Sequence, residues 1–128
     1  MYGFFTTVTG SFNDAVEKVT EALKTEGFGV LTEINVKETM KKKLDKDMKE
    51  YKILGACNPN YAFQSISAEP DIGLLLPCNV IVREENDGKI TIGFMDPHAV
   101  LGMVDNDKVG TLGKEVKEKL EKVKNLLK

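Results

Sequence analysis

The stretch NVIVREENDGKITIGFM, residues 79–95, decides the fold of this 128-residue chain. Residues 79–84 and 89–95 are rich in β-branched side chains, and they flank the sequence Glu85-Asn86-Asp87-Gly88. An Asp-Gly pair between two such runs is typical of a β-hairpin, because the tight turn needs positive φ angles that glycine adopts at little cost. The stretch therefore predicts two antiparallel strands, and at least part of the sheet must be antiparallel.

Further strands and helices are expected on both sides of this hairpin. Runs of apolar and β-prone residues predict strands over residues 4–9, 28–34 and 51–57. Three helices are predicted to begin after the capping residues Ser11, Asn35 and Asn58. A fourth helix is predicted over residues 107–127, where apolar side chains recur at helical spacing. In the Asn58-Pro59 pair we expect Asn58 to be the cap and Pro59 the first helical residue.

The predicted order of elements is β-α-β-α-β-α-β-β-α. This order indicates an α+β fold, a two-layer sandwich in which helices pack on one face of a mostly antiparallel sheet. No repeat, linker or low-complexity segment interrupts residues 1–128, so we expect a single domain, and the length is typical of one.

Charge and composition argue against several classes of protein. The chain has 18 basic and 20 acidic residues, a net charge of −2, which gives no broad basic field for nucleic acid. Residues 72–77 are the longest uncharged apolar stretch, too short for a membrane span, and residues 1–7 do not resemble a signal peptide. Two cysteines are too few for a disulfide scaffold. We therefore expect a cytoplasmic protein with reduced thiols and no membrane or nucleic-acid partner.

The most unusual motif is a pair of related strings, Cys57-Asn58-Pro59 and Pro77-Cys78-Asn79. Cys57 precedes the cap of a predicted helix, and the backbone N–H groups at a helix N-terminus can lower the pKa of a thiol. The cysteines can meet only if strand 51–57 runs antiparallel to the strand that begins at Asn79. The alternative is that both cysteines are small buried apolar residues and that the asparagines are caps.

A third segment, Asp96-Pro97-His98, follows the second hairpin strand, whose end lies beside the start of the first strand. A lone loop histidine is more often a surface residue. The candidate site at one sheet edge is therefore Cys57, Asn58, Cys78, Asn79, Asp96 and His98. We find no metal-ligand spacing, phosphate-binding glycine loop or nucleophile elbow, so we expect no metal or cofactor and assign no catalytic residue.

Three longer strings carry a family resemblance. They are ILGACNP at 53–59, AEPDIGLLLPCNV at 68–80 and EGFGVLTEI at 26–34, with Met95-Asp96-Pro97 downstream. Over nearly the whole chain the sequence resembles a bacterial and archaeal family called domain of unknown function 302 (DUF302). The resemblance implies a compact α+β fold, a cytoplasmic location and homodimers, and it implies no activity.

Two functions from different classes remain open. We favour a homodimeric small-ligand-binding or interaction module, because catalytic motifs are lacking and the predicted loops 72–76 and 100–104 are unusually apolar. Exposed apolar patches of that kind usually mark interfaces. The alternative is a thiol-dependent redox enzyme or sensor that uses Cys57 and Cys78.

Overall fold

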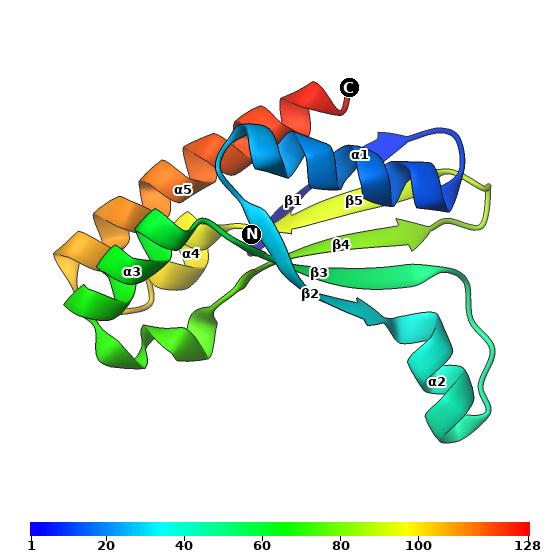
Figure 1. The fold of residues 1–128 in the computed structure, drawn as a ribbon, viewed down its shortest axis with the longest axis horizontal. Coiled ribbons are helices and arrows are strands. Elements are labelled where there is room, and N and C mark those ends of the chain that lie inside the picture. Colours follow the sequence, from blue (N-terminus) through cyan, green and yellow to red (C-terminus); the bar gives the residue numbers. More distant parts are fainter.

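The computed structural model describes residues 1–128 and contains the elements labelled in Figure 1. The strands are β1 (Gly3–Val8), β2 (Gly29–Asn35), β3 (Tyr51–Cys57), β4 (Cys78–Glu84) and β5 (Ile90–Met95). The helices are α1 (Phe12–Thr25), α2 (Val36–Leu44), α3 (Pro59–Ala68), α4 (Pro97–Leu101) and α5 (Asp107–Leu126), with a 3₁₀ helix, η1 (Pro70–Leu75). The predicted α+β order is confirmed, and α4 and η1 are added in segments that were predicted as connections.

The strands form one antiparallel sheet in the order β1-β5-β4-β3-β2. The predicted hairpin lies inside the sheet, with Val80 opposite Phe94, and its turn passes through Gly88 at a φ of 83°. On the other side of β4, Cys78 lies opposite Ala56 of β3. The antiparallel pairing of β3 with β4, which the sequence left open, is therefore present.

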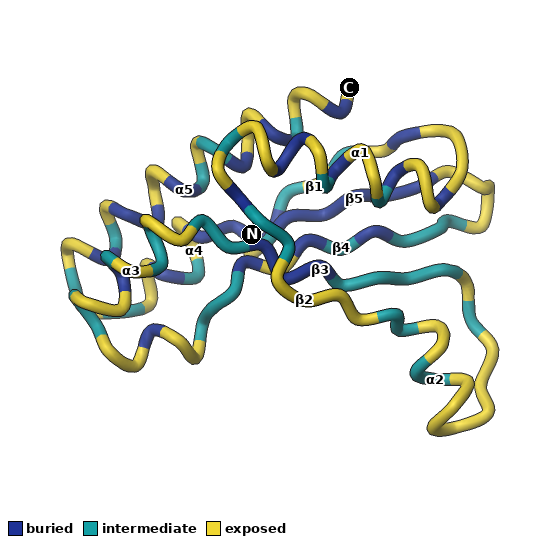
Figure 2. Tube along the Cα trace, viewed as in Figure 1, coloured by how far each residue is buried: buried dark blue, intermediate teal, exposed yellow.

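Helices α1 and α5 cover one face of the sheet, which gives the predicted two layers (Figure 1). Figure 2 shows the buried residues gathered along β5, β4 and the inner sides of both helices. The main core includes Val19 of α1, Leu120 of α5 and Ile92 of β5, all of them fully buried. The opposite face is partly open: Phe5 and Ile34 remain 40 and 48% exposed there. One face of the sheet is therefore buried in the main core, and the other face is apolar and partly exposed.

Side-chain caps fix where the longer helices begin. Ser11 and Asn35 cap α1 and α2 as predicted, each accepting a backbone N–H three residues further on at 3.0 Å. Asn106 caps α5 in the same way, and its side-chain amide also donates to the Ala68 carbonyl at 3.0 Å. This second bond ties the start of α5 to the end of α3.

The apolar segments 72–76 and 100–104, in which the sequence suggested an interface, are partly covered by the chain itself, and Ile72 and Leu101 are fully buried. Ile72 of η1, Leu101 of α4 and Val109 of α5 form a second, small core. Only Leu74 and Met103 stay largely exposed, at 88 and 72%. These residues are covered because η1 and α4 fold back onto each other and α4 packs along α5.

Substituting a buried and an exposed phenylalanine should change the free energy of unfolding by very different amounts. Phe94 is 1% exposed and stacks on Phe4, with ring centroids 5.4 Å apart, so Phe94→Ala should lower the free energy of unfolding by about 3–5 kcal/mol. Phe63 on α3 is 73% exposed, so the matched control Phe63→Ala should change it by less than about 0.5 kcal/mol. Urea unfolding of both variants measures this, and equal losses would contradict the described core.

Candidate functional site

A cavity of about 310 Å³ lies where β3 ends and β4 begins, beneath α3. Helix α3 stands at the end of the sheet and packs against α5 and η1 (Figure 1). Of the 16 residues that line the cavity, 11 are hydrophobic and none carries a charge. The cavity is therefore an apolar space at the junction of the sheet with its end helices.

The two cysteines both line this cavity. Pairing of β3 with β4 places Cys78 opposite Ala56, and Cys57 is the next residue along β3. Cys78 is buried and Cys57 is half-buried, and neither forms a disulfide. The strand pairing thus brings two free thiols to one site.

Burial raises the pKa of both thiols. For Cys78 the pKa rises to about 12, first because burial disfavours the charged thiolate and second because a Cys57 thiolate would repel it. Burial alone raises the pKa of Cys57. The expectation that the start of α3 lowers the pKa of Cys57 was wrong, because desolvation at the cavity wall dominates. Both groups are therefore neutral thiols near pH 7.

Asn58 also lines the cavity, but its side chain does not cap α3. It occupies the capping position, and Pro59 is the first helical residue as predicted. Its amide instead donates to the Glu26 carbonyl at 3.2 Å. Gly27, at a φ of 84°, ends α1 beside this amide, and a Cβ there would lie 3.0 Å from Asn58 Nδ2. Asn58 therefore fastens the end of α1 to the start of α3 at the cavity.

Asn79 does not join the cysteines. Along β4, buried Cys78 and Val80 alternate with exposed Asn79, because successive side chains point to opposite faces of a sheet. Asn79 lines a shallow hollow with Phe5 and Ile81 on the open face. The expectation that Asn79 completes the thiol site was therefore wrong, because Asn79 follows Cys78 directly and its side chain points to the other face of the sheet.

Asp96 and His98 also lie outside the cavity, and they begin α4. The backbone N–H groups of His98 and Ala99 donate to Asp96 Oδ1 at 2.9 and 3.1 Å, and Lys117 Nζ lies 2.9 Å from Asp96 Oδ2. Burial alone would raise the pKa of Asp96, but these hydrogen bonds and the Lys117 charge lower it overall. His98 is exposed beside a polar hollow. Asp96 is thus a structural cap, and the pair does not border the thiols.

Several cavity residues were not predicted as site residues. Tyr61, Ala62 and Ser65 present one side of α3 to the cavity, and the spacing of Ala62 and Ser65, small residues three apart, is the signal that could have revealed this face. Leu31 lies at a β-bulge, where the register of β2 with β3 shifts between Val30 and Thr32, and it lines the cavity while 67% exposed.

Gly55 of β3 lets Thr32 and Pro77 pack close to the backbone of this strand. A Cβ on this residue would lie 2.9 Å from Pro77 Cγ and would clash with the Thr32 hydroxyl. Both Thr32 and Pro77 line the cavity. The glycine therefore lets the segment leaving η1 pack close to β2 and β3.

No group of three or more histidine, cysteine, aspartate or glutamate side chains is placed to hold a metal ion. None of the helices combines the length and the apolar character that crossing a membrane requires.

Comparison with known proteins gives the family. The sequence model described as domain of unknown function DUF302 matches residues 4–127. This chain belongs to the DUF302 family. A crystal structure of an uncharacterized conserved DUF302 protein from Bacillus stearothermophilus is similar over 100% of this chain and 99% of that one, with a TM-score of 0.92 and 28% identity. No curated protein matches the chain. The family resemblance seen in the sequence is thus confirmed.

The raised pKa values predict how the two thiols react. Iodoacetamide is attacked only by the thiolate, which displaces its iodide, so Cys57 should be alkylated slowly near pH 7 and faster as the pH rises. Cys78, buried and with a pKa of about 12, should stay unmodified in the folded protein up to about pH 10. Peptide mass spectrometry across a pH series measures both.

The matched controls are Cys57→Ser, which should abolish alkylation, and Cys78→Ser, which should leave it unchanged. If Cys57 reacts near pH 7 faster than a free thiol in an unstructured peptide does, the described electrostatics of the site are wrong.

Proposed function

We propose that this DUF302 protein is a small-ligand-binding module, a single domain over residues 1–128, that works as a homodimer in the cytoplasm. Its ligand would occupy the cavity beside Cys57 and Cys78. The observation that carries the proposal is the cavity itself, about 310 Å³ with 11 hydrophobic residues among its 16 lining residues. Small-molecule sites are usually apolar concavities of about 300–1,000 Å³ with a few polar groups.

The surroundings of the thiols favour binding over thiol catalysis. A nucleophilic cysteine needs an electropositive, partly exposed environment or an adjacent base. The cavity wall contains no histidine, lysine or arginine, and burial raises the pKa of both thiols. The thiol-dependent alternative is supported by one observation, that Cys57 and Cys78 line the same cavity. Rapid alkylation of Cys57 near pH 7 would favour that alternative.

Occupation of the cavity can be tested by filling it from α3. Ala62 lines the cavity and Ser67 lies exposed on the same helix, so Ala62→Phe and Ser67→Phe introduce the same side chain inside and outside the site. Three probes of one shape cover the possible charges: 2-naphthalenemethanol, 2-naphthoate and 2-naphthalenemethylammonium. We expect at least one to shift the amide resonances of Cys57 and Cys78 in two-dimensional NMR spectra at millimolar concentration.

Those shifts should be lost in Ala62→Phe and kept in Ser67→Phe. The spectrum of Ala62→Phe without probe shows whether the variant keeps its fold. If none of the three probes shifts the cavity resonances of the unmodified protein, the proposed function fails.

The homodimer is supported by the uncovered sheet face. Phe5 and Ile34 are exposed on that face at 40 and 48%, and paired chains of this kind are most often related by a two-fold axis. Sedimentation equilibrium at micromolar concentration should give twice the chain mass of 14.2 kDa. Phe5→Lys should shift the protein toward monomer, whereas Met103→Lys, on an exposed residue away from the sheet, should not. A monomer at all concentrations would rule out the homodimer.

A further inference from the structure

We propose that the cavity selects an uncharged, apolar molecule of about twelve nonhydrogen atoms and rejects anions of the same shape. This inference rests on the proposed binding function and adds the chemical class of the ligand. The size follows from comparison: a cavity of about 150 Å³ holds benzene, and this cavity is about twice as large, at about 310 Å³.

The walls offer no counter-charge to an ionised ligand. All 16 lining residues are uncharged, and the polar groups among them are thiols, hydroxyls and one amide. Part of this hydrogen-bonding capacity is already used: Ser65 Oγ donates to the Tyr61 carbonyl at 2.8 Å, and the Asn58 amide donates to Glu26. A carboxylate or phosphate entering the cavity would lose its water without gaining a cationic partner, which is costly.

Two carboxylates of α5 act on one cavity residue, Tyr61. Burial raises the pKa of Tyr61, and the carboxylates of Glu115 and Glu118 on α5 raise it further. The same two charges would repel an anion bound beside Tyr61. A cation would be attracted to them, but neither carboxylate lines the cavity, so an ammonium group would lose its water there without forming a direct ion pair.

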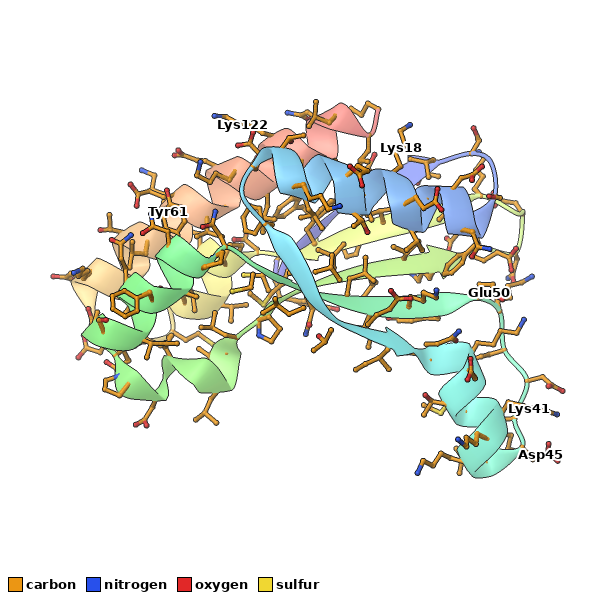
Figure 3. All side chains as sticks on the ribbon, viewed as in Figure 1. Lys18, Lys41, Asp45, Glu50, Tyr61 and Lys122 are labelled. Carbon is orange, nitrogen blue, oxygen red and sulfur yellow. The ribbon has the colours of Figure 1, made fainter.

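The basic run of the chain, Lys41-Lys42-Lys43, lies far from the cavity. Figure 3 shows Tyr61 on α3 at one end of the molecule and Lys41 on α2 at the opposite end. The Lys41 side chain is paired there with Asp45 and Asp47, at 2.9 and 3.2 Å. Lys122 and Lys18 lie on α5 and α1, on the outer side of the helical layer (Figure 3). No lysine lines the cavity.

The mouth of the cavity is apolar as well. Leu31 of β2 and Ile66 of α3 both line the cavity and are 67 and 45% exposed. A bound apolar molecule would cover part of these side chains and remove apolar surface from water, which is favourable at roughly 25 cal/mol per Å². A thiol S–H is a weak hydrogen-bond donor, which a hydroxyl or carbonyl oxygen of such a ligand would accept.

The three naphthalene probes separate this inference from the proposed function. NMR titration at pH 7 should give 2-naphthalenemethanol at least a tenfold lower Kd than either 2-naphthoate or 2-naphthalenemethylammonium. If the carboxylate or the ammonium binds as tightly as the alcohol, the inference is overturned while the binding function stands. If none binds, the binding function itself fails.

The proposed size of the ligand is tested with one smaller and one larger aromatic alcohol. The smaller benzyl alcohol and the larger 1-pyrenemethanol should both bind more weakly than 2-naphthalenemethanol. Tighter binding of 1-pyrenemethanol would overturn the proposed size.

The role of the two carboxylates can be tested without touching the cavity wall. The double variant Glu115→Gln/Glu118→Gln should raise the affinity for 2-naphthoate severalfold at low salt and leave that for 2-naphthalenemethanol unchanged. Glu21→Gln on α1 is the matched control and should change neither affinity. Unchanged 2-naphthoate binding in the double variant would overturn the part assigned to Glu115 and Glu118.

Discussion

The antiparallel pairing of β3 with β4 is the constraint on which the rest of the structure depends. Because these strands are neighbours and run in opposite directions, the chain between them must leave and return at the same end of the sheet. Residues 58–77 therefore stand beyond the sheet as α3 and η1 and do not cross one of its faces. The space that they enclose is the cavity, and Cys57 and Cys78 line it because Cys57 is the last residue of β3 and Cys78 is the first residue of β4.

The state of the thiols and the choice of ligand have one physical cause. A wall that gives a thiolate no compensating charge keeps Cys78 protonated, with its pKa at about 12. The same wall would give no compensating charge to an ionised ligand. A thiolate mechanism and an apolar binding site therefore make opposite demands on these residues, and the observed lining meets the second demand.

Local patterns predicted the elements well, whereas the site depended on contacts that no local pattern contains. The hairpin of residues 79–95 follows from its turn and its β-branched runs, and so it was predictable. Asn79 was assigned from its place at a strand end, although the face to which it points depends on alternation. Asn58 was read as a cap, but its partner is the Glu26 carbonyl, 32 residues away. The pKa of Cys57 depends on desolvation by side chains that fold around it.

The β-bulge at Leu31 also affects how the sheet edge meets other molecules. β2 is an edge strand, and a regular edge is a template on which a strand from a neighbouring chain can add and begin aggregation. The extra residue breaks the hydrogen-bonding ladder at this point, so an incoming strand could not pair along the whole of β2 without a matching irregularity. Glu33, held by Lys52 at 2.7 Å, adds a charge to the same edge. Leu31, which borders the cavity, thus also helps to end the sheet at β2 and to keep newly made chains from pairing edge to edge.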